Sequence, residues 1–235
     1  MNRSDAKWRI IVAATQLEYY PHFHGELGTD HHLRANYFTD EAYRGCVVEV
    51  GGGTPVCHSL SRHWICNGWR GIIIEPNPHF VALHRAIGNE VFECACSDHD
   101  EGDADFYVVG PPRDSVPDGI LTEHATSSLG PRPSHLAWHQ VRSIDQLEHT
   151  KIRVKVRTLD SVLQEAGNPT IDILSVDTEG WELEVMRGFD LARHRPAFVI
   201  LENFAYDPAY TEYMEERGYK ARIQLAYNYI FAPAP

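Results

Sequence analysis

Short apolar runs alternate along the chain with segments in which apolar residues recur every three or four positions. A short apolar run bounded by polar or glycine residues is typical of a buried strand, and the longer period is typical of a helix packed on a sheet. The runs predict buried strands at residues 46–50, 71–75, 91–95, 171–177 and 197–201. The periodic segments predict helices over residues 56–64, 77–88, 158–167, 179–188 and 207–218.

The C-terminal pattern differs, because residues 219–232 read as two strands joined by a tight connection and are therefore antiparallel. Strands that are apolar on both faces and are separated by helices indicate a mostly parallel sheet covered on both sides. We therefore predict an α/β fold with a doubly wound, Rossmann-like sheet and a C-terminal antiparallel hairpin. The length of 235 residues fits one large domain.

Two stretches lack this alternation of strand and helix patterns. Residues 1–45 precede the first strand, and residues 99–150 form a long connection rich in proline, serine and glycine. Loops of this length in a compact domain are usually functional lids or disordered segments. We expect residues 46–235 to form the main domain with 99–150 as an insertion, and residues 1–45 to add a helical segment that caps the substrate site.

Net charge, hydropathy and cysteine content indicate which partners and compartments to expect. The formal net charge of -12 repels phosphate backbones, so we expect no nucleic-acid partner. No apolar stretch approaches the roughly 20 residues of a membrane span, and the start of the chain is a poor signal peptide. The odd number of cysteines, with Cys46 and Cys94 inside apolar runs, favours free thiols in a reducing compartment such as the cytoplasm.

Glycines and acids follow the predicted strands. The segment GGGTPV has Gly51 and Gly53 but places Val56 where a dinucleotide-binding loop has its third glycine. The sequence therefore gives little support for a loop that binds a diphosphate. Glu75 ends the second strand and is placed to accept hydrogen bonds from ribose hydroxyls. Asp98 follows the third strand and is placed to accept one from the adenine amine. An adenosine ligand with a positively charged tail, such as S-adenosylmethionine, fits these residues better than NAD.

Six segments carry a family resemblance: VVEVGGG, GWRGIIIEPNP, CACSD, VRTLDSVL, IDILSVDTEGWELEVMRGF and AFVILE. Their order and spacing resemble the FkbM-type S-adenosylmethionine-dependent methyltransferases over roughly residues 28–232, most specifically in SVDTEGWELEVMRG. The resemblance implies a seven-stranded methyltransferase sheet with an antiparallel last strand. It also implies methyl transfer to hydroxyl groups of sugars or of polyketide-type natural products.

The resemblance places the cofactor against a set of residues around the strand ends: Glu49, Gly51, Gly52, Ser59, Glu75, Pro76, Ser97, Asp98 and Asp177. A neutral alcohol is a poor nucleophile and gains from a base that takes its proton. Asp177, Glu179 and Glu202 lie at adjacent strand ends. We expect Asp177 to accept the proton, and Glu179 and Glu202 to orient the acceptor hydroxyl.

Three acids at one edge could also bind Mg²⁺. We expect no metal, because no fourth acidic ligand lies nearby in the chain. The clustered histidines His22, His24, His31 and His32 also lack a helical metal-binding spacing, although His31 and His32 are the next candidates for the base. The acceptor is expected to contact the following side chains: Asp30, His31, His32, Ser127, Ser128 and Trp181.

Three other functions stay open at this point: a metal-dependent O-methyltransferase, a NAD-type dehydrogenase and a non-catalytic protein that binds an adenosine ligand. A dehydrogenase would need the diphosphate loop that GGGTPV lacks, and a fold alone does not establish catalysis. The expected partner is a small-molecule hydroxyl acceptor, with no membrane partner, and assembly into a homo-oligomer is left open.

Overall fold

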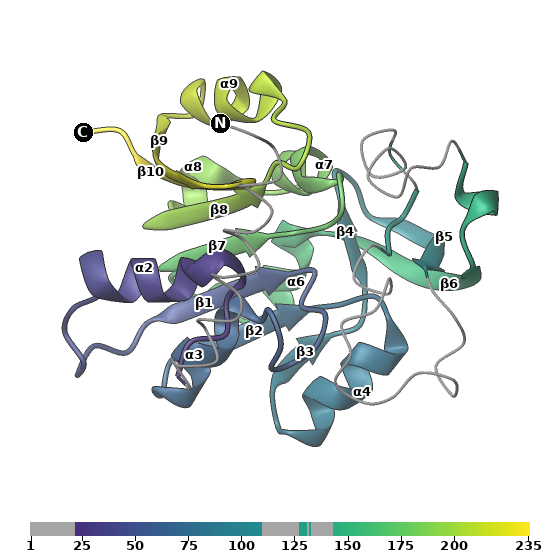
Figure 1. The fold of residues 1–235 in the computed structure, drawn as a ribbon, viewed down its shortest axis with the longest axis horizontal. Coiled ribbons are helices and arrows are strands. Elements are labelled where there is room, and N and C mark those ends of the chain that lie inside the picture. The colour runs from purple at the N-terminus through teal and green to yellow at the C-terminus, as the bar shows by residue number, and fades with distance from the viewer. Residues whose placement is uncertain (1–21, 110–126, 131, 133–142) are drawn as a thin grey trace, which may run out of the picture.

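The computed structural model describes residues 22–109, 127–130, 132 and 143–235. These residues form two sheets (Figure 1). The larger has seven strands in the order β3 (Glu90–Phe92), β2 (Arg70–Ile74), β1 (Cys46–Val50), β7 (Ile173–Val176), β8 (Phe198–Glu202), β10 (Asn228–Pro233) and β9 (Tyr219–Leu225). The smaller has three, in the order β4 (Ala95–Ser97), β6 (His149–Thr158) and β5 (Glu101–Val109).

The larger sheet has the predicted topology. Strands β3, β2, β1, β7 and β8 pair in parallel, whereas β10 is antiparallel to both β8 and β9. Strand order therefore runs outward from β1 in both directions, with β2 on one side and β7 on the other. The prediction of a doubly wound, seven-stranded sheet with a C-terminal antiparallel hairpin is confirmed.

Helices cover both faces of this sheet (Figure 1): α2 (Thr29–Asn36), α3 (Leu60–Cys66), α4 (Pro78–Ala86), α6 (Leu159–Glu165), α7 (Glu182–Arg187), α8 (Leu191–His194) and α9 (Pro208–Glu215). The 3₁₀ turn η2 (Glu26–Gly28) precedes α2, and η5 (Ile144–Gln146) precedes β6 of the smaller sheet. Neighbouring residues of β1 face opposite sides. Val47 packs with residues of α2 and α3, and Val48 packs with residues of α6, α7 and α9. In the described part of the chain, none of the helices has the length and apolar character needed to cross a membrane.

Two helices begin later than their sequence periods predict. Helix α3 starts at Leu60 and not at residue 56, and the side chain of Val56 is exposed in the preceding loop. Helix α7 starts at Glu182 because Glu179 and Gly180 both have positive φ angles, 57° and 94°. A spacing of three or four shows which residues share a face, but it does not show where helical hydrogen bonds begin.

The predicted strand at residues 91–95 is wrong as a single element. Strand β3 ends at Phe92, and after a bend β4 begins at Ala95 in the smaller sheet, where it pairs with β6. An apolar run looks the same whether a strand continues or the chain crosses to a second sheet. The crossing changes which residues reach the edge where ligands bind.

The expected insertion at 99–150 begins and ends in strands. Residues 101–109 form β5 and residues 149–158 form β6, and the two pair antiparallel. Alternate residues of both strands build a small apolar cluster with Ala95: Phe106, Val108 and Val154, with Ile152 and Leu129 packed against it. Residues 110–126 and 133–142 lie outside the described residues, and the division at residues 45 and 46 stays a prediction.

Candidate functional site

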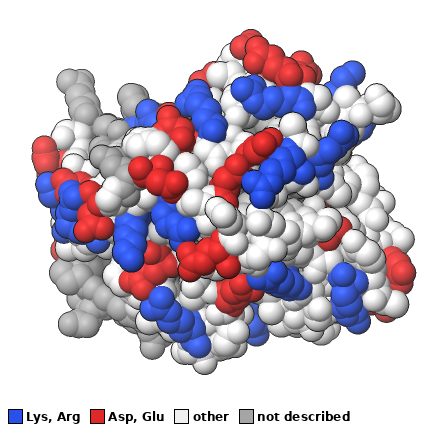
Figure 2. Space-filling view, turned by 180° about the vertical axis from the view of Figure 1, so that it is seen from behind, with Lys and Arg blue, Asp and Glu red and all other residues white. Residues whose placement is uncertain are grey.

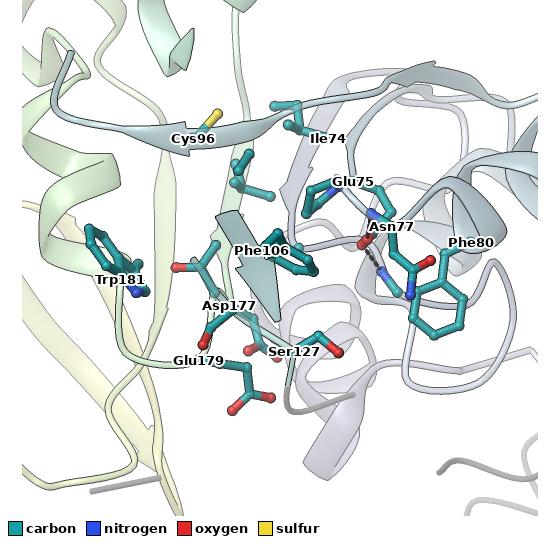
Figure 3. A pocket seen from close by; sticks show the side chains of 18 of the residues that line it. Ile74, Glu75, Asn77, Phe80, Cys96, Phe106, Ser127, Asp177, Glu179 and Trp181 are labelled. Atoms are coloured by element: carbon teal, nitrogen blue, oxygen red, sulfur yellow. Dashed lines mark hydrogen bonds between the residues drawn. The ribbon is translucent and has the colours of Figure 1, made fainter. Parts of the chain in front are cut away.

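A pocket opens at the carboxyl ends of the central parallel strands (Figure 3). Gly51 follows β1, Glu75 follows β2, Asp177 follows β7, and Glu202 ends β8, and all four line the pocket. Strand order changes direction between β1 and β7, and ligands of open α/β sheets bind at such a point. The fold therefore places the predicted strand-end acids at one edge.

The glycine loop keeps this edge closely packed. Gly51 has a φ of 82°, and a Cβ on it would lie 1.7 Å from the backbone oxygen of Asp177. A Cβ on Gly52 would collide with Ile73 at 2.3 Å, whereas Gly53 faces open space. Two glycines are thus required by contacts within the protein, and Gly53 leaves room at the pocket wall.

Glu75 lies where its sequence position predicts. The side chain is buried, and its carboxylate accepts hydrogen bonds from the backbone N–H groups of Gly53 at 2.8 Å and Asn77 at 2.7 Å. Burial raises the pKa of Glu75 to about 7, against the lowering effect of these two hydrogen bonds. The two N–H groups fix the direction of the carboxylate, and its role in binding ribose stays a prediction.

Asp98, which was expected to accept a hydrogen bond from the adenine amine, lies outside the described lining of the pocket. Its side chain is 43% exposed and pairs with His99 at 2.5 Å, and neither Asp98 nor Ser97 lines the pocket. Because the chain crosses to the smaller sheet after Phe92, this wall is lined instead by β4 and β5 residues, including Cys96 and Phe106. The wall is therefore apolar where an acid was expected.

Two other expected cofactor residues have structural partners. The buried carboxylate of Glu49 accepts hydrogen bonds from the backbone N–H of Leu60 at 2.6 Å and from the hydroxyls of Ser59 and Ser61 at 3.2 and 2.5 Å. Burial raises the pKa of Glu49 to about 7. Glu49 and Ser59 thus hold the start of α3 and do not line this pocket, whereas Pro76 does.

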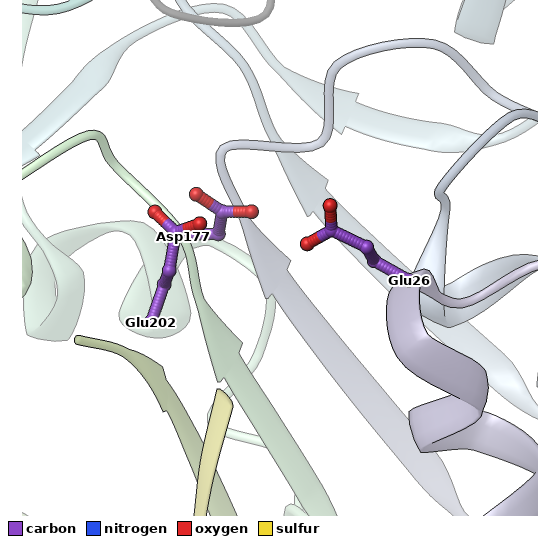
Figure 4. A group of neighbouring side chains, drawn as sticks. All are labelled: Glu26, Asp177 and Glu202. Carbon is purple, nitrogen blue, oxygen red and sulfur yellow. The ribbon is translucent and has the colours of Figure 1, made fainter. Parts of the chain in front are cut away.

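The three candidate catalytic acids meet in the pocket, and a fourth joins them. One carboxylate oxygen each of Glu26, Asp177 and Glu202 lie within 4.8 Å of one another (Figure 4), and Glu179 lines the same pocket. Glu26 belongs to η2, far from the other acids in sequence, and no motif marked it. The sequence showed no fourth acid nearby in the chain, and the fold brings one from a distant segment.

Burial beside other acids raises the pKa values of Asp177, Glu179 and Glu202. Desolvation raises the pKa of Asp177 to about 8, with further contributions from the charges of Glu26 and Glu182. The pKa values of Glu179 and Glu202 lie well above their ordinary value, again mainly because of burial and then because of Asp177 and the other acids. Near neutral pH the group therefore favours binding protons or a cation.

Glu182, which the sequence patterns also missed, shapes the loop that carries Glu179. Its buried carboxylate accepts hydrogen bonds from the N–H groups of Thr178 at 2.8 Å and Gly180 at 3.0 Å, and from the Tyr210 hydroxyl at 2.6 Å. These bonds hold the turn in which Glu179 has a φ of 57°. The segment TEGWE thus supplies two acids: Glu179 lines the pocket, and Glu182 holds the loop that carries Glu179.

Three of the expected acceptor contacts line the pocket. Ser127 and Ser128 do so, and the Ser127 hydroxyl accepts a hydrogen bond from the Val109 N–H at 3.0 Å. Trp181 also lines it, and the Arg132 guanidinium lies 4.2 Å from the centre of the indole ring. Whether these residues contact an acceptor stays a prediction.

The N-terminal candidates lie elsewhere. The Asp30 carboxylate is fully buried and accepts hydrogen bonds from the backbone N–H groups of His24, Gly25 and His31 at 2.7, 2.9 and 2.8 Å. Asp30, His31 and His32 do not line the pocket, contrary to expectation. Asp30 closes the turn that presents Glu26, so this segment reaches the pocket through a different acid.

The charge of the pocket identifies the ligands that it suits. Its described lining residues include the acids Glu26, Glu75, Asp177, Glu179 and Glu202 and no lysine or arginine. Such a lining favours a cationic ligand and opposes a diphosphate. A NAD-type dehydrogenase is therefore poorly supported by the site.

Comparison with known proteins identifies the family of the chain. The sequence model of the methyltransferase FkbM domain matches residues 50–221, which is more than half of the chain. Neither a curated protein nor a solved structure gave a significant match. The chain therefore belongs to the FkbM methyltransferase family.

Proposed function

We propose that the protein transfers a methyl group from S-adenosylmethionine to a hydroxyl group of a sugar or natural-product acceptor. The observation that carries this proposal is the joint position of Glu75 and the acids around Asp177 on the two sides of the glycine loop. Glu75 would hold an adenosine on one side, and the acids on the other side would receive an alcohol and its proton. Membership of a methyltransferase family supports the reaction class.

The residues of the pocket fit this cofactor. Glu75 is fixed by two N–H donors and keeps further acceptor capacity for ribose hydroxyls. Gly53, where a Cβ would meet no atom within 4 Å, leaves space beside it. Phe106 and Cys96 offer an apolar wall for the adenine ring. The acids of the pocket complement the positive sulfonium and ammonium groups.

The bound cofactor would supply an activated methyl group on a sulfonium. The acceptor oxygen would bond to the methyl carbon while the carbon–sulfur bond broke and its electron pair went to sulfur. The hydroxyl proton must go to a base, and we assign this role to Asp177, which ends β7 inside the pocket. Glu179 and Glu202 would orient the hydroxyl.

The acceptor would enter between the larger and smaller sheets. Ser127, Ser128 and Trp181 line that side of the pocket and combine hydroxyl groups with an aromatic face. Such a surface suits a sugar or a glycosylated natural product. Glu26, and not Asp30, His31 or His32, is the contribution expected from the N-terminal segment.

The remaining expectations belong to the same proposal. The described cysteines are all free, as in a cytoplasmic protein. On one face of the molecule acidic and basic side chains are interspersed (Figure 2), and Lys151 and Arg153 both pair with Asp105. A nucleic-acid or membrane partner is therefore not proposed, and a homo-oligomer is left open.

Calorimetry followed by an activity screen tests the function. We expect S-adenosylmethionine to bind, and a labelled methyl group to pass to at least one member of a panel of sugars and polyketide glycosides. Binding of NAD without binding of S-adenosylmethionine would overturn the proposal in favour of a dehydrogenase. Binding without transfer to any hydroxyl compound in the panel would favour a non-catalytic binding protein.

A further inference from the structure

Buried acids in a folded protein need hydrogen-bond donors, and one acid of the pocket finds none among the residues that the structure describes. Four of the five described acids with buried side chains accept hydrogen bonds from N–H or O–H groups: Asp30, Glu49, Glu75 and Glu182. Glu202 is only 7% exposed, and its one hydrogen-bond partner among the described residues is the carboxyl group of Asp177. The described part of the chain thus supplies no N–H or O–H donor to its carboxyl group.

The neighbours of Glu202 indicate the kind of partner. Its carboxyl group faces that of Asp177, and both face Glu26 across the pocket (Figure 4). Neither lysine nor arginine is found among the described residues that line the pocket. Among the described residues no basic side chain offsets these acids, and a cation from solution or bound protons would do so.

The spacing of the oxygens fits a metal ion. One oxygen from each acid lies within 4.8 Å of the other two. A Ca²⁺ ion holds carboxylate oxygens at about 2.3–2.6 Å, so it can join oxygens up to about 4.6–5.2 Å apart. Mg²⁺, at about 2.0–2.1 Å, would need these side chains to approach by less than about 1 Å.

We propose that Glu26, Asp177 and Glu202 together bind one hard divalent cation at the end of the pocket where the methyl group is transferred. Carboxylate oxygens are the ligands that Mg²⁺, Mn²⁺ and Ca²⁺ prefer. The cation neutralises the buried acids and supplies the partner that Glu202 lacks. The role of this site in catalysis rests on the proposed function, but the binding of the cation does not.

A residue behind the site positions one ligand. The Tyr227 hydroxyl donates a hydrogen bond to Glu26 Oε1 at 2.7 Å. Outer-shell hydrogen bonds of this kind orient metal ligands, and their loss typically weakens metal binding roughly 10–100-fold. Tyr227 is therefore a positioning residue for the cation.

The cation refines the proposed reaction. Three carboxylates leave coordination positions of a divalent ion free for acceptor oxygens. An acceptor with two neighbouring oxygens, such as a vicinal diol of a sugar, would fill two of them. Asp177 then serves as a ligand, and the hydroxyl proton passes to Glu179, the remaining acid beside the site.

Metal titration without cofactor or acceptor tests the site directly. After treatment with chelator and its removal, Mn²⁺ is titrated into the full chain and free Mn²⁺ is followed by electron paramagnetic resonance, with Mg²⁺ and Ca²⁺ as competitors. We expect one Mn²⁺ per chain. No saturable binding of Mn²⁺, Mg²⁺ or Ca²⁺ at millimolar concentrations would overturn the proposal.

Variants locate the ion. Glu202→Gln and Glu26→Gln should each weaken Mn²⁺ binding by more than the roughly 10–100-fold that loss of an outer-shell partner costs, and Tyr227→Phe should fall within that range. Glu212→Gln, at an exposed acid of α9, is the matched control and should bind as the wild type does. Binding that survives Glu202→Gln and Glu26→Gln would place the ion elsewhere and overturn the assignment.

Two further measurements distinguish failure of the metal site from failure of the proposed function. The melting temperature of the wild type should rise with Mn²⁺, and that of folded Glu202→Gln should not, because only a ligand of the native state stabilises it. Titration of S-adenosylmethionine into chelator-treated protein reports on the proposed function independently. If S-adenosylmethionine does not bind but Mn²⁺ does, the proposed function is contradicted and the proposed metal site still stands.

Discussion

Gly51 lies directly against the backbone carbonyl of Asp177, so that a Cβ on Gly51 would come within 1.7 Å of the carbonyl oxygen. This contact joins the loop after β1 to the end of β7 across the point where strand order changes direction. The glycine therefore sets how closely the loop after β1 can approach the end of β7.

We expect Gly51→Ala to destabilise the fold by roughly 2–5 kcal/mol, which combines left-handed strain with overpacking. Gly53→Ala is the control, because Gly53 also has a positive φ, 50°, but its Cβ would enter open space. That variant should lose only the strain of roughly 1–2 kcal/mol. Urea unfolding compares the two, and equal losses would contradict the role given to the Gly51 contact.

Glu75→Ala should weaken S-adenosylmethionine binding by roughly 1.5–3 kcal/mol, because it removes charge-assisted hydrogen bonds to the ribose. Calorimetry measures this loss. Asp98→Ala should leave the affinity unchanged, since Asp98 is exposed and does not line the pocket. A stronger effect of Asp98→Ala than of Glu75→Ala would show that the pocket is occupied differently.

Asp177→Asn should lower turnover by roughly 10²–10⁴-fold, the usual contribution of a general base, with little change in cofactor affinity. A metal ligand at this position would also lower turnover, so the variant tests the site and not the choice between the two roles. Near-normal turnover in steady-state kinetics would contradict both roles.

Glu179→Gln separates the two roles. If a cation occupies the acids, Glu179 receives the proton and its loss should cost roughly 10²–10⁴-fold in turnover without altering Mn²⁺ affinity. If Asp177 is the base, Glu179 only orients the hydroxyl, and the loss should be smaller than that of Asp177→Asn. Single-turnover rates of the two variants, measured with and without chelator, decide between them.

In chelator-treated protein, Asp177→Asn should be more stable than the wild type at pH 7. The folded-state pKa of Asp177 is about 8 against an ordinary value of 3.8. As pH rises through this interval, the unfolded chain releases a proton that the folded chain retains, so Asp177 increasingly destabilises the fold. The gain in melting temperature should therefore shrink toward pH 4, and a gain independent of pH would contradict the raised pKa.

Glu182→Gln should have the opposite effect and destabilise the fold by roughly 1–3 kcal/mol, because a carboxylate with several buried donors is replaced by a group that cannot accept from all of them. The hydroxyl of Tyr210 and the N–H groups of Thr178 and Gly180 are the donors affected. Thermal unfolding at pH 7 measures the loss. Equal stability would mean that these bonds do not hold the loop of Glu179.

The sequence by itself determined the sheet and most of its edge. Apolar runs located the parallel strands, and the residues that follow them, Gly51, Glu75, Asp177 and Glu202, reach one pocket. The reason is geometric, since the carboxyl ends of parallel strands lie along one edge and local sequence shows where each strand ends.

Only the tertiary structure decided which acids are free to act. The carboxylates of Glu49 and Asp30 are occupied by backbone and hydroxyl donors, and Asp98 leaves the pocket because the chain crosses to a second sheet after Phe92. Glu26 enters from a turn in the N-terminal segment. These hydrogen-bond partners and neighbouring acids come together through contacts between residues that are distant in the chain. Local sequence patterns do not predict such contacts.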